Sequence, residues 1–138
     1  MQFTKKAAVM AAGVALFAGL GLTGTAAQAA GTGVLACSTS NAVTPIPTVK
    51  VDNTIVIELR YSTSSRCAWG RITNADPGDQ VWVDRSSNGG TTWAGPWGVT
   101  TVQSGTDTHT PAYNDAGYKM RACAKNDSTG TVRCTGWY

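Results

Sequence analysis

Charged residues are scarce in this chain of 138 residues, where 11 Lys and Arg and 8 Asp and Glu together make up 14%. Such a low charge excludes a coiled coil and a charged disordered tail. It also excludes a strongly basic nucleic-acid binder, because few cations are available to neutralise phosphates. We therefore expect no nucleic-acid partner.

Histidine and closely paired cysteines are also scarce. His109 is the only histidine, and none of the four cysteines forms a Cys-x-x-Cys pair. Protein metal sites are usually built from such clusters, so we expect no metal ion and no other cofactor. The chain has no Gly-x-Ser-x-Gly nucleophile motif, and a catalytic thiol is not expected because all four cysteines can pair. The chain is predicted not to be an enzyme.

Only one long apolar run is present. Residues 7–22 carry no charge, two lysines precede them, and the small-residue motif Ala27-Gln28-Ala29 follows. This is the pattern of a secretory signal peptide, and the run is shorter than the roughly 20 residues of a membrane-spanning helix. We expect residues 1–30 to be a signal peptide that is cleaved near Ala29 or Ala30. The mature protein is then secreted and makes no stable membrane insertion.

Cleavage would leave nine basic and eight acidic residues, so the mature chain is close to neutral. Residues 31–47 are rich in Gly, Thr, Ser, Ala and Pro, which predicts an extended N-terminal arm. Residues 48–138 show no internal repeat and no change of composition that would mark a second domain. They are predicted to form one domain. We expect a monomer.

The four cysteines are expected to form disulfides, because secretion exposes them to an oxidising compartment. Four cysteines allow three connectivities. Cys123 and Cys134 flank a turn cluster at residues 125–130, and a hairpin there would bring the two thiols together. This local geometry favours Cys123–Cys134, which leaves Cys37–Cys67.

Alternating side chains predict β-strands throughout the mature chain. Ile55, Ile57 and Leu59 would share one face of a strand, with Glu58 and Arg60 on the other. No segment after the leader has helical periodicity. The fold class is therefore all-β, a small antiparallel sandwich or barrel-like domain with two disulfides. The expected strands are 48–51, 54–61, 66–72, 80–85, 91–93, 99–102, 118–124 and 131–137.

Residues 86–93 read Ser-Ser-Asn-Gly-Gly-Thr-Thr-Trp and predict a hairpin. They resemble the Asp-box, with Asn88 in the place of the aspartate. In the families that carry this motif it lies away from the catalytic centre, so we interpret it as a hairpin clasp. Trp93 is expected to pack beneath the turn and Trp69 in the core, while Pro96 should interrupt the following strand.

The other aromatic residues are candidates for surface recognition. Trp82 shares a strand face with Asp84, opposite Val81 and Val83, and should face solvent. Exposed aromatic rings can stack on sugars or anchor a protein partner. The main hypothesis is a secreted, non-enzymatic binding module for a cell-wall glycan or an extracellular protein. Its candidate binding surface consists of Trp82, Trp97, Trp137, Tyr138, Arg60 and Arg71.

Two alternatives remain open. Arg60-Tyr61 near a turn could enter the cleft of an extracellular hydrolase, which would make the protein an inhibitor. Glu58 and His109, with Arg60 or Arg71, would supply the base, acid and phosphate clamp of a small secreted ribonuclease. Against this, Glu58 and Arg60 lie two residues apart on a strand and fit an exposed ion pair.

The stretch from about residue 57 to 138 resembles the YjfA-like family, small secreted domains that are common in actinobacteria and have no established function. The resemblance implies an extracellular recognition module and transfers no catalytic residue. The sequence departs from the family in having Cys37 alone near its start, and in the longer spacing at residues 63–66. The matching segments are 58–62, 67–72, 77–79, 84–93, 121–123 and 133–138.

Overall fold

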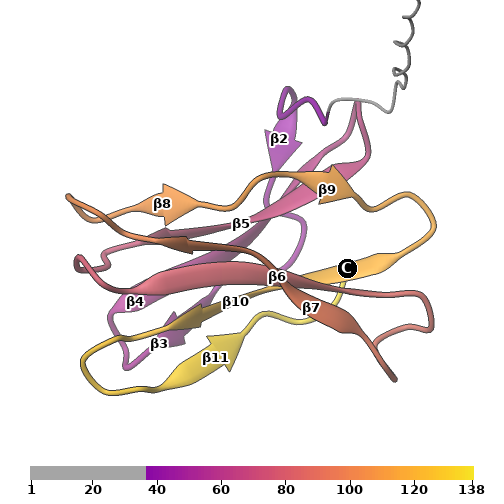
Figure 1. The fold of residues 1–138 in the computed structure, drawn as a ribbon. Coiled ribbons are helices and arrows are strands. Elements are labelled where there is room, and N and C mark those ends of the chain that lie inside the picture. Colours follow the sequence, from indigo (N-terminus) through magenta and orange to yellow (C-terminus); the bar gives the residue numbers. More distant parts are fainter. Residues whose placement is uncertain (1–36) are drawn as a thin grey trace, which may run out of the picture. The chain divides into compact units, whose positions relative to one another are not determined.

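Two antiparallel β-sheets pack face to face in the computed structural model, which describes residues 37–138 (Figure 1). This part of the chain is one compact unit, Cys37–Tyr138, and contains strands but no helix. It therefore has no helix long and apolar enough to cross a membrane. The all-β fold class predicted from the sequence is confirmed. The predicted signal peptide and its cleavage site lie outside the described residues.

The four-stranded sheet has the strand order β11-β10-β6-β7, and all its neighbours are antiparallel. The six-stranded sheet has the order β2-β4-β5-β8, with β3 also pairing with β4 and β9 also pairing with β5. The strand bounds are β2 Ala42–Val43, β3 Val49–Val51, β4 Ile55–Ser62, β5 Cys67–Thr73, β6 Gln80–Ser86, β7 Ala94–Thr101, β8 Thr108–His109, β9 Tyr113–Asn114, β10 Lys119–Lys125 and β11 Val132–Cys134.

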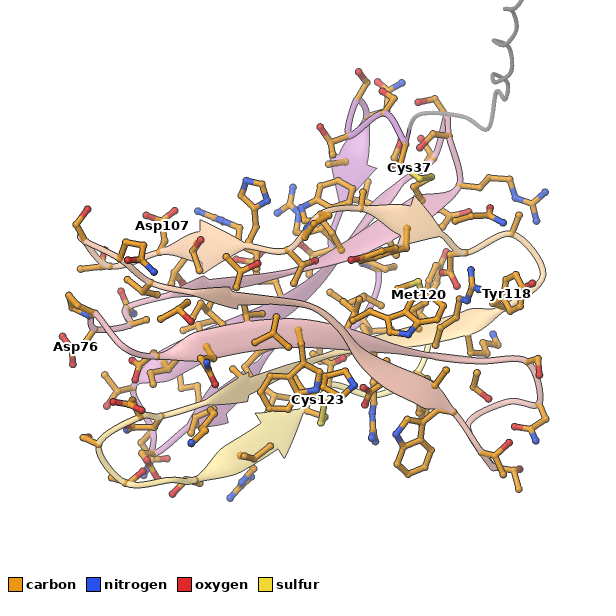
Figure 2. All side chains as sticks on the ribbon, in the orientation of Figure 1. Cys37, Asp76, Asp107, Tyr118, Met120 and Cys123 are labelled. Carbon is orange, nitrogen blue, oxygen red and sulfur yellow. A yellow bond between two sulfur atoms is a disulfide. The ribbon has the colours of Figure 1, made fainter. Side chains whose placement is uncertain are left out.

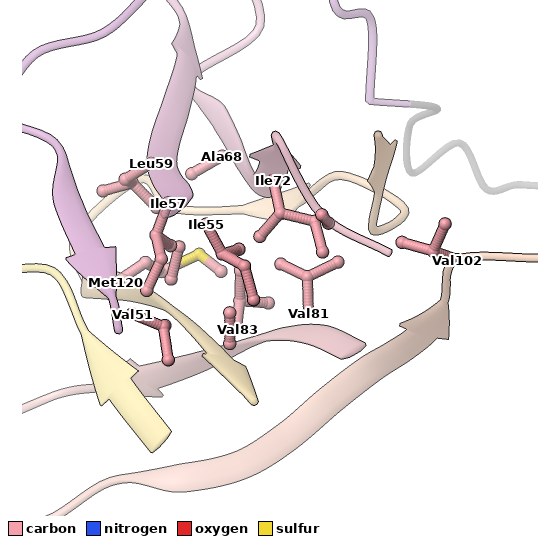
Figure 3. Packing of buried hydrophobic residues seen from close by; sticks show 13 residues of the cluster. Val51, Ile55, Ile57, Leu59, Ala68, Ile72, Val81, Val83, Val102 and Met120 are labelled. Carbon is pink, nitrogen blue, oxygen red and sulfur yellow. The ribbon is translucent and has the colours of Figure 1, made fainter. Parts of the chain in front are cut away.

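The core lies between the two sheets and is made of alternate residues of the long strands (Figure 3). Ile57 and Leu59 of β4 are fully buried, and Val81 and Val83 of β6 face them from the other sheet. The predicted alternation is therefore correct. Each such side chain contributes about 1.5–3 kcal/mol through its removal from water.

Gly70 lies where β5 packs tightly against the four-stranded sheet. A Cβ added there would lie 3.1 Å from Val81 and 3.2 Å from the Cβ of Ala122. A larger residue would force the facing strands to move, and close-packed cores resist such shifts. The absence of a side chain at Gly70 thus allows β5 to pack against the four-stranded sheet.

Both disulfides pair as the turn argument favoured. Cys123 and Cys134 are register partners on β10 and β11, with Cα atoms 4.0 Å apart. Cys37 bonds to Cys67 at the start of β5, with a Cα separation of 5.7 Å. Residues 37–47 of the expected arm belong to the compact unit, because β2 pairs with β4.

Strand β7 differs from the prediction at both ends. The return strand expected at residues 91–93 begins at Ala94, and it continues through Pro96, where an interruption was expected. The reason is that β7 is an edge strand. Its register with β6 shifts on either side of Val83, whose partner on β7 is Trp97. A proline lacks the backbone N–H but is tolerated at a sheet edge or bulge, where a ladder bond is not required.

Candidate functional site

The hairpin between β6 and β7 is held by the side chain of Ser86, which is 1% exposed. Its Oγ accepts hydrogen bonds from the backbone N–H of Gly90 at 2.8 Å and of Asn88 at 3.1 Å. Asn88 in turn accepts one from the N–H of Thr92 at 2.9 Å. The motif resembling the Asp-box therefore acts as a local clasp and presents the next residue, Trp93, in a defined position.

Trp93 is 50% exposed, so the expectation that it packs in the core or under the turn is wrong. Because β7 begins only at Ala94, Trp93 lies outside the paired region and rests against the side chains of Arg121 and Trp137. Trp69, with 7% exposure, is buried as predicted. An exposed ring on a clasped hairpin is available to a ligand.

Arg121 lies against two indole rings, whose centroids are 5.9 Å apart. Its guanidinium carbon is 4.4 Å from the ring centroid of Trp93 and 4.7 Å from that of Trp137. Its Nε donates to Oδ2 of Asp84 at 2.9 Å, and Asp84 is only 4% exposed. The two indoles shield part of the guanidinium from water, which strengthens the ion pair.

A cluster of Asp84 with the sulfur atoms of Cys123 and Cys134 has the spacing of possible metal ligands. The chemistry does not fit a metal, because both sulfurs are joined in a disulfide and neither can become a thiolate. The contact of 3.6 Å between the Cys123 sulfur and Asp84 is not a hydrogen bond for the same reason. The Asp84 carboxylate is committed to Arg121.

A second arginine also lies against two aromatic rings. The guanidinium carbon of Arg85 lies 4.4 Å from the ring centroid of Trp97 and 4.0 Å from that of Tyr118. Its Nη1 donates to the carbonyl oxygen of Asn114 at 2.9 Å. Trp97 is itself steadied by Tyr113, with ring centroids 5.4 Å apart. The guanidinium is therefore rigidly positioned at the end of β6.

An open pocket of about 270 Å³ lies beside Arg85 and its two aromatic rings. We call it the Arg85 pocket; it is lined by Arg85, Ser87, Thr92, Trp93, Ala94, Trp97 and Tyr118. It combines three aromatic rings, hydroxyl groups and one cation, with no carboxylate in its lining. Trp93 lines this pocket and also contacts Arg121, so the pocket and the surroundings of Arg121 form one continuous surface.

The structure separates the six residues of the predicted binding surface. Trp97 lines the Arg85 pocket, and Trp137 covers Arg121. Trp82 is partly buried and is the register partner of Cys123 on the outer face of the four-stranded sheet. Tyr138 is 38% exposed and packs edge-on against Tyr61, with centroids 5.1 Å apart.

Arg60 and Arg71 lie on the six-stranded sheet and are not brought together with the tryptophans. Both bind Glu58: Arg60 Nη1 is 2.9 Å from its Oε1, and Arg71 Nη1 is 3.1 Å from its Oε2. The predicted ion pair between Glu58 and Arg60 is present. It is part of a network, and the Glu58 side chain is only 14% exposed.

Sequence reasoning missed four residues of this surface, namely Arg85, Trp93, Tyr118 and Arg121. One pattern could have revealed Arg85: it follows Val81 and Val83 on the apolar face of β6, where a charged residue needs a partner. The position of Arg121 opposite Asp84 depends on strand register, which no local pattern in the sequence reports.

Glu58, Arg71 and His109 form a row across three adjacent strands. Glu58 is the register partner of Arg71, and Arg71 is the register partner of His109. The His109 Nδ1 lies 2.9 Å from the Thr110 carbonyl oxygen, which can only accept, so Nδ1 carries the proton. Asp107 lies beside this row, and Tyr118 lines the Arg85 pocket. Figure 2 shows these two residues at opposite ends of the domain.

Asp115 is a buried carboxyl group close to the Arg85 pocket. It is 6% exposed, and its Oδ1 has no hydrogen-bond partner within residues 37–138. Burial raises the pKa of Asp115 to about 7, although the positive charges of Lys119, Arg85 and Arg66 oppose the shift. The group therefore changes charge near neutral pH.

Comparison with known proteins gives a family but no function. No curated protein and no solved structure matches the chain. Residues 27–128 match the model of a family described as "Protein of unknown function (DUF2690)". This match covers well over half of the sequence and includes every strand except β11, together with the hairpin clasp and the Arg85 pocket. The chain belongs to this family of proteins of unknown function.

Proposed function

We propose that the protein is a secreted, non-enzymatic binding module and that it recognises an extracellular glycan through the Arg85 pocket. The observation that carries the proposal is the convergence of Trp93, Trp97 and Tyr118 around one arginine. A pocket of about 270 Å³ suits one small unit of a larger ligand, such as a single sugar ring.

The surroundings favour binding by a rigid surface. The clasp at Ser86 holds the hairpin, and the Cys123–Cys134 disulfide holds β10 against β11 on the same sheet. Little side-chain freedom is lost when a ligand meets such a preformed site. Aromatic faces present apolar area to the C–H face of a sugar, and the hydroxyls of Ser87 and Thr92 can bond its hydroxyls.

Secretion is supported by the apolar leader and by the two disulfides, which are typical of oxidising compartments. Expression of the full chain in a bacterial host, followed by N-terminal sequencing of the medium fraction, tests this. The expected product begins at Ala30 or Gly31. Retention of the complete chain inside cells, with reduced cysteines, contradicts secretion.

Retention on insoluble glycans tests binding. The mature protein is applied to peptidoglycan, chitin and cellulose, together with Trp97→Ala and Trp82→Ala. Trp97→Ala should reduce affinity by about tenfold or more, as is usual for a central aromatic contact. Trp82→Ala is the matched control, because Trp82 lies outside the pocket lining. Equal retention of both variants, or none of any protein on any glycan, contradicts the proposal.

RNA cleavage is the second candidate, favoured by the row of Glu58, Arg71 and His109. Adjacent strands lie about 4.8 Å apart, so Glu58 and His109 stand on the two sides of Arg71. Glu58 would accept the 2′-hydroxyl proton as that oxygen attacks phosphorus. His109 would protonate the departing 5′-oxygen, and a 2′,3′-cyclic phosphate would result.

This candidate ranks second because arginines hold both oxygens of Glu58. The test is cleavage of single-stranded RNA by the mature protein, by Glu58→Gln and by His109→Ala. Loss of cleavage in both variants supports the assignment, and cleavage that survives both excludes these roles. The inhibitor alternative gains no support. On β4, Arg60 is bound to Glu58, and Tyr61 is packed against Tyr138.

A further inference from the structure

We propose that the ligand of the Arg85 pocket carries a carboxylate, and that the Arg85 guanidinium binds it edge-on. The ligand class is then an acidic saccharide, a chain whose sugar rings carry carboxylate groups. This inference rests on the proposed glycan-binding function and makes it more specific. It is argued from Arg121 and Arg85, which each lie against two aromatic rings but differ in their hydrogen-bond partners.

Arg121 shows what an arginine in aromatic surroundings binds here. Its guanidinium carbon lies against the rings of Trp93 and Trp137, and its Nε donates to the carboxylate of Asp84 at 2.9 Å. All N–H groups of a guanidinium lie in its own plane, so it forms its hydrogen bonds there. Its planar fork of N–H groups matches the two oxygens of a carboxylate.

Arg85 also lies against two aromatic rings but has no such carboxylate. Its guanidinium carbon is 4.4 Å from the ring centroid of Trp97 and 4.0 Å from that of Tyr118. Within residues 37–138, no carboxylate oxygen lies within 4.0 Å of its nitrogens. Nη1 donates one hydrogen bond to the Asn114 carbonyl, and a guanidinium has five N–H donors, so four remain.

The pocket directs these remaining donors to a ligand. Arg85 is the only charged side chain in the lining, so the pocket attracts an anion. Asp115 is a nearby acidic residue of opposite charge to Arg85, but it is buried and does not line the pocket. A partly buried cation that has unused in-plane donors and no carboxylate partner within residues 37–138 is most stable when the ligand supplies the carboxylate.

The rest of the lining selects a sugar among carboxylate compounds. Trp93 is 50% exposed and offers a flat apolar face next to the cation. Ser87 and Thr92 supply hydroxyls on the hairpin side. A sugar ring bearing a carboxylate presents an apolar C–H face, hydroxyls and an anion within one small unit. The pocket provides a partner for each of these groups.

Binding to two polymers that differ only in the carboxylate tests the inference. Polygalacturonate and its fully methyl-esterified form share the same sugar backbone, and only the first is charged. Tryptophan fluorescence of the secreted, oxidised protein follows binding at physiological salt. We expect at least tenfold tighter binding of polygalacturonate than of the ester, and the same preference in Arg60→Gln, whose site lies on the other sheet.

Two variants connect the preference to Arg85. Arg85→Gln removes the charge and the fork, and it should bind both polymers equally and weakly. Arg85→Lys keeps the charge without the planar fork, and it should retain only a small part of the preference. The wild-type comparison of acid and ester needs no variant, so it remains decisive if a substitution disturbs folding. Thermal melting of each variant reports folding.

The possible failures are distinguishable. Equal binding of acid and ester that depends on Trp97 overturns the carboxylate inference and leaves the glycan-binding module. Equally tight binding of dextran sulfate, or a loss in Arg60→Gln matching that in Arg85→Gln, shows nonspecific charge attraction and overturns the inference. Retention on chitin or peptidoglycan without binding of polygalacturonate overturns the acidic-sugar inference alone. No binding to any of these polymers overturns both proposals.

Discussion

Asp84 and Arg121 face each other as register partners across β6 and β10, and their ion pair is 2.9 Å long on the outer face of a sheet. Such a position is normally wet, yet Asp84 is 4% exposed. Trp93 and Trp137 cover the pair from the hairpin and from the C-terminal segment. The aromatic surface therefore depends on a charge pair, and the charge pair depends on the aromatic surface.

The substitution Arg121→Gln should destabilise the fold by about 3 kcal/mol, because it leaves the buried Asp84 carboxylate without its cation. Urea unfolding of the oxidised protein measures this. The double variant Asp84→Asn with Arg121→Gln should recover most of the loss, because no buried charge remains. Arg60→Gln, which removes a more exposed partner of Glu58, should cost less than about 1 kcal/mol. An equally small loss for Arg121→Gln would contradict the interpretation.

Gly90→Ala should disturb the contact between the hairpin and the C-terminal segment. Gly90 has φ of +99°, and an added Cβ would lie 2.6 Å from Nε1 of Trp137. Gly89→Ala is the matched control, because Gly89 has φ of +74° with no atom within 4 Å of the new Cβ. Backbone strain alone should cost Gly89→Ala about 1–2 kcal/mol.

The loss for Gly90→Ala should exceed that of the control, with a change in tryptophan fluorescence as Trp137 moves from Arg121. Unfolding curves and emission spectra of the two variants provide the comparison. If the two variants lose the same stability and keep the same spectrum, Trp137 does not pack on the hairpin as described.

Asp115→Asn should flatten the dependence of stability on pH. The folded state holds the Asp115 proton up to about pH 7, while the ordinary pKa is 3.8. Between these values the unfolded chain loses the proton first, so stability falls as pH rises and then stays level. The shift corresponds to a loss of at most about 4 kcal/mol.

Melting temperatures of the wild type and Asp115→Asn between pH 4 and 8 measure this effect. The melting temperature of the variant should rise relative to that of the wild type as the pH increases to 7. Above pH 7 the difference should stay constant. Asp107→Asn is the control, because Asp107 is exposed and lies at the opposite end of the domain. Parallel curves for wild type and Asp115→Asn would show that Asp115 does not titrate in this range.

Removing each disulfide should destabilise the protein to a different extent. The Cys37–Cys67 bridge closes a separation of 30 residues and the Cys123–Cys134 bridge one of 11. Loop-closure entropy predicts losses of about 4 and about 3 kcal/mol for the two double serine variants. Urea unfolding of the variants tests the order. A larger loss for the shorter loop would mean that packing around Cys123, which is 1% exposed, dominates.

The local patterns of the sequence predicted the elements well. Alternation placed Ile57 and Leu59 inside and Glu58 outside, because side chains of a strand point to opposite faces. The turn cluster between Cys123 and Cys134 favoured the observed disulfide, since a hairpin joins neighbours in the chain. Strand β7 was only partly predicted, because an edge strand tolerates the proline that a central strand excludes.

The candidate site was predicted less well, because its residues meet only through long-range pairing. Trp97 was named from the sequence, but its partner Arg85 was not. Arg60 was grouped with the tryptophans, although it lies on the other sheet. The row of Glu58, Arg71 and His109 depends on the register of three strands. A shift of one residue would turn each side chain to the other face.

The sequence by itself determined the strand character, the turns and the pairing of cysteines across one hairpin, since these follow from backbone preferences and from neighbours along the chain. Only the tertiary structure decided which charges meet which rings. Arg121 finds Asp84 across two strands, and Arg85 finds Trp97 and Tyr118 from separate segments. Such contacts are set by strand order and register, and these result from packing the whole core rather than from any single segment.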